Sequence, residues 1–171
     1  MSRHNARIIG IMTLFNMDML NLKKEDTYTV LDDILKLESE EEYPVKIDID
    51  YAKELVEGII NNLEEIDELI SKYLVNYTLD RLSYVDRAII RLCSYEMKYL
   101  GLNKSIAINE AIEITKEYSS VDMSEQVKFT NRVLDNIAFG ISTQNNTNNN
   151  NINNNNINNN NINNNINKGN N

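Results

Sequence analysis

The feature that most constrains the fold is the scarcity of residues that interrupt helices. The chain of 171 residues contains one proline and five glycines. Between the few turn signals, apolar residues recur at steps of three and four, which is the period of an amphipathic helix. Few helix breakers together with this period predict an all-α protein, a compact bundle of about six to seven helices.

The helices can be placed from their caps and turn signals. Residues 5–20 and 26–37 each carry apolar residues at helical spacing, and the segment 38–48 around Pro44 is predicted to be a linker. Asp50 is predicted to cap a long helix that runs to Tyr73. Three more helices are predicted: from Ser83 to Gly101, from Ser105 onward, and from a capping-box pattern at residues 122–125 to Gly140.

The first of these helices carries an apolar stripe. Ile8, Met12, Phe15 and Met19 repeat along it at steps of three and four. Because stripes of this kind usually face the core of a protein, we expect these four side chains to point inward.

The end of the chain differs in composition from the rest. From Gln144 onward it is almost only asparagine, punctuated by four isoleucines whose spacing fits neither a helix nor a strand. Such a segment has too little apolar surface to offset the entropy lost on ordering. We therefore expect one helical domain over residues 1–141 and a disordered, Asn-rich tail over residues 142–171.

The formal net charge of −9 is unevenly distributed along the chain. Residues 1–24 carry four bases and one acid, whereas residues 25–76 carry four bases and sixteen acids. Acids and bases nearly cancel over residues 77–140. The start of the chain can therefore attract an anionic partner although the whole protein is acidic.

Residues suited to catalysis or metal binding are scarce. The single histidine, His4, excludes a paired-histidine zinc site, and the single Cys93 cannot form an internal disulfide. There is no glycine-rich phosphate loop, no signal segment and no apolar run long enough to cross a membrane. We therefore expect a cytoplasmic protein that is not an enzyme and that binds no cofactor, metal or membrane.

Two groups of side chains are suited to nucleic acid, because they combine cations, aromatic rings and an amide. The first group consists of Arg3, His4 and Arg7 with Phe15, and the second consists of Lys128, Phe129, Asn131 and Arg132. We expect the two groups to form opposite walls of one RNA-binding groove. The alternative is that both phenylalanines belong to the core and that the cations only solubilise the surface.

Five segments in this order and spacing resemble the NusB family. They are RHNARIIGIMTLFNMD, DYAKELVEGIINNLEEIDELI, LSYVDRAIIRLCSYEM, IAINEAIEITKEYS and KFTNRVLDNIA, and the likeness covers about residues 2–139. The resemblance implies an all-helical fold of two packed three-helix halves. It also implies a transcription antitermination factor that binds the boxA element of nascent ribosomal RNA leaders.

The resemblance further implies partners and site residues. Members of this family bind boxA together with NusE, a protein of the small ribosomal subunit, and join other Nus factors on RNA polymerase. The family's RNA contacts fall on Arg3, His4, Arg7, Phe15, Tyr73, Lys128 and Phe129. The family's acidic contact with NusE falls on Asp86.

Two other classes of protein stay open. The chain could be a helical bundle that binds only proteins, or a stand-alone RNA-recognition module of the kind attached to ribosomal RNA cytosine methyltransferases. The sequence also leaves open whether the free protein forms a homodimer.

Overall fold

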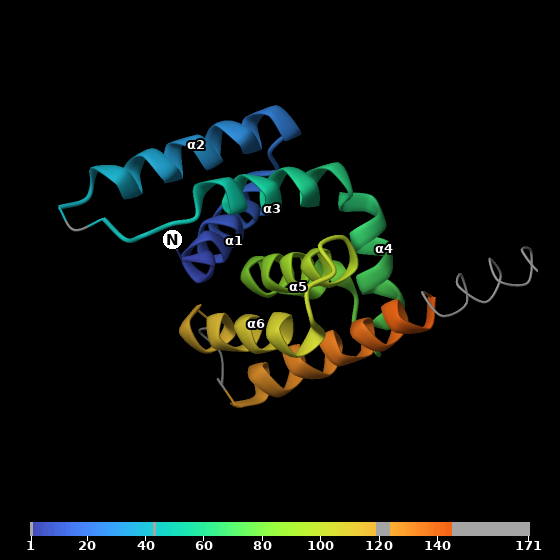
Figure 1. Ribbon diagram of the computed structural model, residues 1–171. Coiled ribbons are helices and arrows are strands. Elements are labelled where there is room, and N and C mark those ends of the chain that lie inside the picture. The colour runs from blue at the N-terminus through green and yellow to red at the C-terminus, as the bar shows by residue number, and fades with distance from the viewer. Residues whose placement is uncertain (1, 43, 119–123, 145–171) are drawn as a thin grey trace, which may run out of the picture. The chain divides into compact units, whose positions relative to one another are not determined.

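The structure is a computed structural model that describes residues 2–42, 44–118 and 124–144. In chain order the elements are α1 (Arg3–Leu20), α2 (Lys24–Glu40), α3 (Ile49–Asn61), α4 (Leu63–Tyr73), the short 3-10 helix η1 (Leu79–Arg81), α5 (Tyr84–Lys98) and α6 (Lys104–Tyr118). Residues 124–144 are also helical, and no strand occurs within the described ranges (Figure 1). The predicted all-α class is therefore confirmed.

The contacts of the chain divide it into two units, Met1–Ala138 and Phe139–Asn171. In the second unit residues 139–144 are described and are helical, and the Thr143 hydroxyl donates to the Phe139 carbonyl at 2.9 Å. The Asn-rich segment from residue 145 onward lies outside the described residues. Its disorder, and the domain boundary expected at residue 141, stay predictions.

Within the first unit, helix α5 is the central element. It contacts α1, α3, α4 and α6, while α1, α2 and α3 contact one another (Figure 1). The side chains that are most deeply buried come from α1, α3, α4, α5, α6 and the helical residues 124–138, and include Leu14, Leu55, Ile59, Ile66, Ile70, Ile89, Ile90, Ile114 and Leu134. Within the described ranges, no helix has the length and apolar character that spanning a membrane requires.

Several helix ends agree with the sequence signals, and two do not. The Ser83 hydroxyl accepts from the Asp86 backbone N–H and caps α5, and Gly101 has a φ of +63°, as a left-handed stop requires. Helix α3 is capped by Asp48, not by Asp50. At the start of α6 the Asn103 side chain, not Ser105, supplies the acceptor, which lies 2.9 Å from the Ser105 backbone nitrogen.

The single long helix predicted from Asp50 to Tyr73 is wrong, because α3 ends at Asn61 and α4 begins at Leu63. Between them Asn62 has φ −120° and ψ 21°. Its side-chain amide donates to the Gly58 carbonyl at 2.8 Å. An asparagine that bonds locally to the backbone competes with the helical ladder, which explains why the apolar seam continues while the helix does not.

The stripe expected to face inward on α1 is also wrong. Met12 and Met19 are 38% and 45% exposed, and Ile8 and Phe15 are half-buried. The buried face of α1 carries instead Ala6, Ile9, Gly10, Thr13, Leu14 and Met17. Its small residues allow α5 to approach, since a Cβ at Gly10 would lie 3.2 Å from Leu92 Cδ1. Both faces have helical spacing, so spacing alone could not choose between them.

Candidate nucleic-acid interface

Arg7, at the start of α1, points into a cluster of acids and not into solvent. It is 5% exposed. Its Nε donates to Glu96 Oε1 at 2.8 Å, and its Nη1 donates to Glu110 Oε2 at 3.1 Å. The expectation that Arg7 offers a free guanidinium to phosphate is therefore wrong, because both of its acidic partners already occupy that group.

The neighbours of Arg7 complete this N-terminal cluster. Tyr51 donates a short hydrogen bond to Glu96, and His4 Nδ1 lies 3.1 Å from Glu110 Oε2. Burial raises the pKa of Glu96, against the lowering effect of its bonds to Tyr51 and Arg7. The cluster is thus a closed network in which cations and carboxylates largely neutralise one another.

Arg3 is the one arginine of the N-terminal arm that remains exposed, with 63% of its side chain accessible. Its guanidinium carbon lies 4.5 Å from the centre of the Tyr51 ring, and its Nε lies 3.8 Å from Asp48 Oδ2. The arm therefore presents less free positive charge than its composition suggests.

A second region, around the start of α5, holds four rings in two pairs. Phe15 packs edge-to-face on Tyr84, with ring centres 6.1 Å apart, and Phe129 packs on Tyr77 at 5.5 Å. Both phenylalanines are half-buried, while Tyr84 and Tyr77 are 42% and 37% exposed. The phenylalanines are thus neither sealed in the core nor fully exposed, and each supports a tyrosine that faces solvent.

Two arginines lie against these tyrosines. The guanidinium carbon of Arg81 lies 4.9 Å from the centre of the Tyr77 ring, and that of Arg87 lies 5.5 Å from the centre of Tyr84. We call the four rings and two arginines, namely Phe15, Tyr77, Arg81, Tyr84, Arg87 and Phe129, the aromatic surface. Exposed rings with cations beside them are the groups on which single-stranded bases stack.

Asp86 lies beside the aromatic surface, in the wall of a pocket of about 290 Å³ that Tyr77, Ser83, Gln126 and Phe129 also line. Asp86 is 6% exposed, and its Oδ2 accepts from the Ser83 hydroxyl at 2.5 Å. Burial raises the pKa of Asp86, partly opposed by hydrogen bonds from Ser83 and Gln126. The side chain therefore fixes the first turn of α5, and its contact with a partner stays a prediction.

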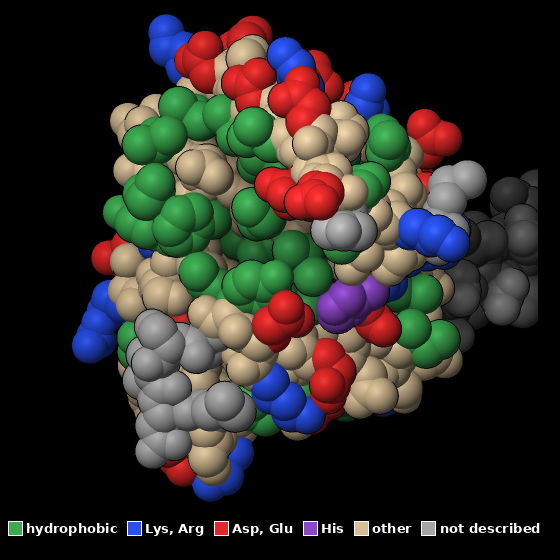
Figure 2. All heavy atoms as spheres, turned by 90° about the vertical axis from the view of Figure 1, so that its left-hand side faces the viewer, with side chains coloured by type: hydrophobic (Ala, Val, Ile, Leu, Met, Phe, Trp, Pro, Cys, Tyr) green, Lys and Arg blue, Asp and Glu red, His purple; other side chains and the backbone are tan. Residues whose placement is uncertain are grey.

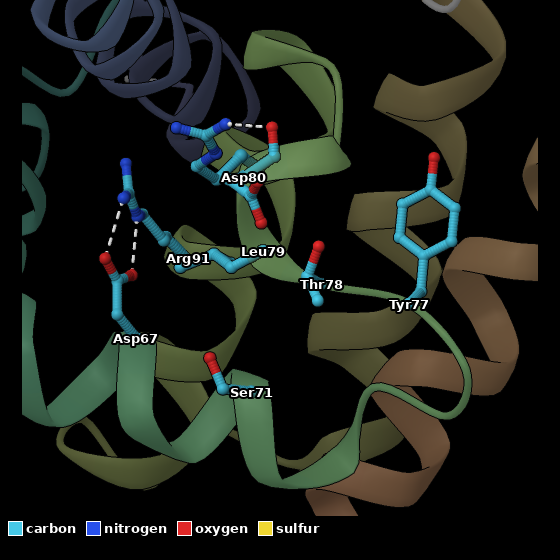
Figure 3. Close-up of a pocket in the computed structure, with 8 residues that line it drawn as sticks. Asp67, Ser71, Tyr77, Thr78, Leu79, Asp80 and Arg91 are labelled. Carbon is cyan, nitrogen blue, oxygen red and sulfur yellow. Dashed lines mark hydrogen bonds and ion pairs between the residues drawn. The ribbon is translucent and has the colours of Figure 1, made fainter.

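A larger polar pocket of about 420 Å³ lies on the other side of Tyr77 and is lined by residues of α4, η1 and α5 (Figure 3). In it, Arg91 forms two hydrogen bonds with Asp67, at 2.7 and 2.8 Å, and a third with Asp18 at 2.7 Å. Asp18 Oδ2 also accepts from Arg87 Nη1 at 3.2 Å. These carboxylates neutralise both arginines, so the pocket positions Arg87 and does not attract anions.

The remaining expected residues belong to neither of these two sets. Tyr73 is half-buried at the end of α4, with Lys72 Nζ 5.4 Å from its ring centre. Asn131 is exposed and donates to Asp135 at 2.9 Å. Lys128 is exposed and pairs with Glu125 at 2.8 Å. The groove expected between the N-terminal residues and Lys128 and Phe129 stays a prediction.

Sequence reasoning missed Tyr77, Arg81 and Tyr84. A usable signal was present in NYTLDRLSYVDR, where each tyrosine is followed by an arginine after three or four positions. The described ranges contain no group of three or more His, Cys, Asp or Glu side chains that could hold a metal ion. Cys93 is fully buried, and burial raises the pKa of its thiol.

Comparison with known proteins gives a consistent result. The family model described as NusB family matches residues 4–139. The transcription antitermination protein NusB of Bacillus pumilus is 36% identical over 145 residues, which cover 84% of this chain and 100% of that protein.

Solved structures agree. The structure of T. maritima NusB is similar with a TM-score of 0.68 and 34% identity, over 81% of this chain and 91% of the other. A chain from the crystal structure of antitermination factors NusB and NusE in complex with dsRNA matches with a TM-score of 0.68 and 26% identity, over 82% of this chain and 99% of the other.

Proposed function

This chain belongs to the NusB family of transcription antitermination proteins, and we propose that it binds the boxA element of nascent ribosomal RNA leaders together with NusE. The observation that carries the proposal is the aromatic surface, where Tyr77 and Tyr84 are exposed and each has an arginine beside its ring. The related complex of NusB and NusE with dsRNA supports both partners. The pair would then join other Nus factors on RNA polymerase and support transcription of ribosomal RNA operons.

The distribution of charge supports a shared site. Residues 25–76 contain α3, α4 and nearly all of α2. The sixteen acids of this segment repel RNA from that part of the surface. Few free cations remain, because Arg7, Arg87 and Arg91 are paired with carboxylates. Few cations release few counterions, so this chain alone should bind RNA weakly and a basic partner should complete the site.

We infer the role of each residue from its exposure and its neighbours. Tyr77, Tyr84 and Phe129 would stack on bases, while Arg81 and Lys128 would contact phosphates. Arg3 and the exposed part of the His4 side chain would supply a second, weaker contact with RNA. Arg7 would act only by holding the N-terminal cluster together. Asp86 would act toward NusE through the position of the first turn of α5.

The alternative, a stand-alone RNA-recognition module of the kind attached to ribosomal RNA cytosine methyltransferases, is disfavoured by one observation. The alignment spans 100% of the Bacillus pumilus protein, and that protein is a transcription antitermination protein over its whole length.

The proposal is tested by fluorescence anisotropy with labelled boxA RNA, with and without NusE. Tyr84→Ala should weaken binding by about 1–3 kcal/mol, roughly five- to a hundredfold, because one stacked base loses its ring. Tyr28→Ala is the matched control, since Lys24 Nζ also lies over the Tyr28 ring, at 6.0 Å, but on the acidic helix α2. Equal affinities of the two variants, or no RNA binding even with NusE, would refute the proposal.

A further inference from the structure

The face of α1 that the sequence placed inward lines a groove on the surface. This apolar groove measures about 380 Å³, and its lining includes Ile8 and Met12 of α1, Glu38 of α2, Val45 of the linker after α2, and Glu117 and Tyr118 at the end of α6. Figure 2 shows this side of the molecule, with hydrophobic side chains gathered in a hollow and acidic side chains around it.

The floor of the groove is apolar yet accessible. Met12 is 38%, Val45 is 53% and Tyr118 is 43% exposed. Ile8 and Met12 are four residues apart and lie one above the other on α1, which makes a ridge with a furrow beside it. A hollow of this size lined by helix ridges suits the apolar side chains of a second helix.

The rim of the groove carries two carboxylates, Glu38 and Glu117. Within the described ranges Glu38 forms no ion pair, and Glu117 has only His4, whose Nε2 lies 4.0 Å from it. His4 itself lies closer to Glu110. Both rim carboxylates act on Tyr118, whose pKa is raised by burial and then by Glu117 and Glu38. The two acids therefore face the same end of the groove, and within the described ranges neither forms an ion pair with a Lys or Arg.

The charge on the rim decides the kind of occupant. Nucleic acid is disfavoured, because phosphates would meet two carboxylates. A second copy of this chain is disfavoured as well, because it would bring another acidic rim and a net charge of −9. A helix with apolar side chains on one face and Lys or Arg beside them matches both the floor and the rim.

We propose that the apolar groove binds a basic amphipathic helix of a partner protein, with its apolar side chains on Ile8, Met12 and Val45 and its cations on Glu38 and Glu117. The groove and the aromatic surface share no residue, although both include side chains of α1: Met12 lines the groove, and Phe15 packs on Tyr84. The protein could therefore hold RNA at one place and a protein at the other at the same time.

The probe for this site is a fluorescein-labelled leucine–lysine peptide whose leucines recur at steps of three and four. A peptide of the same composition whose leucines do not share a helix face is the control. Anisotropy with the full chain at low salt should show binding of the first peptide and at least about tenfold weaker binding of the second, since only the first presents an apolar face. Equal binding of the two peptides would overturn the proposal.

The rim is tested with Glu38→Gln combined with Glu117→Gln. This double variant should bind the probe peptide about three- to tenfold more weakly, because two exposed ion pairs with the peptide are lost. Glu57→Gln combined with Glu64→Gln changes the net charge equally, at exposed positions of α3 and α4 outside the groove. If this second pair weakens the probe as much, the attraction is general and the groove is not the site.

The floor is tested with Met12→Ser combined with Val45→Ser. This double variant should bind the probe peptide about tenfold more weakly, because apolar contact area is lost. Leu20→Ser with Val75→Ser is the control, since these side chains are 56% and 69% exposed elsewhere. All four positions are accessible, so circular dichroism should stay unchanged, and unchanged affinity of the floor variant would refute the site.

Two further measurements separate the occupants. Deleting residues 145–171 should leave probe affinity unchanged; a clear gain in affinity would show that this chain's own tail occupies the groove, which would overturn the proposal. Binding of boxA RNA with NusE should be the same for all groove variants. A loss of RNA binding in parallel with loss of the probe would show that the groove belongs to the RNA site, and would also overturn it.

Discussion

The N-terminal cluster and the aromatic surface contain the same kinds of side chain but use them in opposite ways. In the cluster, Arg7 is buried between Glu96 and Glu110, and the Tyr51 hydroxyl is bonded to Glu96. At the aromatic surface, the ring of Tyr77 is exposed, and Arg81, whose guanidinium carbon lies 4.9 Å from the centre of that ring, is exposed as well.

The difference teaches that composition does not separate a structural arginine from a binding one. What separates them is whether a carboxylate from another helix forms an ion pair with the guanidinium in the folded protein. Arg7 meets two such carboxylates, from α5 and α6. Arg81 has a ring beside it and no ion pair within the described ranges, so it keeps its charge available.

The largest expected effect is a difference in stability between the alanine variants of Arg7 and Arg3. Arg7→Ala should lower the free energy of unfolding by about 3–5 kcal/mol, because Glu96 stays buried without its cation. Arg3→Ala, with 63% of the side chain exposed, should change it by less than about 1 kcal/mol. Chemical denaturation at neutral pH measures both, and equal stabilities would contradict the contrast between them.

The pH dependence sharpens this test. Burial raises the pKa of Glu96 in the folded protein above its pKa in the unfolded chain. The ionisation of Glu96 therefore lowers the free energy of unfolding as the pH rises above the unfolded-chain pKa. Without Arg7 that pKa should rise further. The deficit of Arg7→Ala should therefore shrink when the pH falls from about 7 to about 4.5, toward the ordinary pKa of a glutamate. A deficit independent of pH would mean that the Arg7–Glu96 pair is not its source.

The second effect concerns Phe129. Phe129→Leu keeps an apolar side chain beside Tyr77 but removes the ring, and should weaken boxA binding with NusE by about 1–3 kcal/mol while the melting temperature changes little. Phe129→Ala separates the two roles further, since it also removes packing against Tyr77. If both variants lose stability and neither loses affinity beyond that loss, Phe129 is only a packing residue.

A smaller effect is expected at Asp86, where the contrast between burial and exposure is subtler. Burial raises the pKa of Asp86, so the folded protein binds the carboxyl proton more tightly than the unfolded chain does. The free energy of unfolding therefore falls as the pH rises and Asp86 ionises. Asp86→Asn removes that cost and keeps an oxygen for the Ser83 hydroxyl. Its stability relative to the parent protein should therefore increase from about pH 4 to about pH 7. Denaturation across this range measures the trend, and an opposite slope would show that the carboxylate is stabilised by its bonds.

The smallest effect is a change in salt dependence. Arg81→Gln should reduce the slope of log affinity against log salt by about 0.7–0.9, the value for one phosphate contact. Lys116→Gln is the control, because Lys116 lies on α6 and pairs with Glu113 at 2.7 Å. Equal slopes for the two variants would remove Arg81 from the RNA site.

Much of the fold was predictable because its signals are local. The cap at Ser83 and the left-handed Gly101 bound α5 as expected. One of the two errors has a local cause: the Asn62 amide bonds to Gly58 and divides a helix whose apolar seam is continuous. On α1, two apolar faces compete, and only packing against Leu92 and the neighbouring helices selects the one with small residues.

The site was predictable only in its residue types. Phe15 and Phe129 were identified, but their partners Tyr84 and Tyr77 were not, because each pair joins segments far apart in the chain. Arg7 was assigned to the surface because its acidic partners lie 89 and 103 residues away.

The sequence by itself determined that the chain is helical, where most helices begin and end, and that it resembles one family. The helices and their ends depend on caps, turn residues and periodicity, which act within a few residues, and the resemblance depends on five segments that match in order and spacing. Only the tertiary structure decided which face of α1 is buried, that Arg7 is neutralised and that a second apolar face remains exposed. Such outcomes depend on which distant side chains fill the space and the low-dielectric interior around a residue, and no short stretch of sequence specifies that environment.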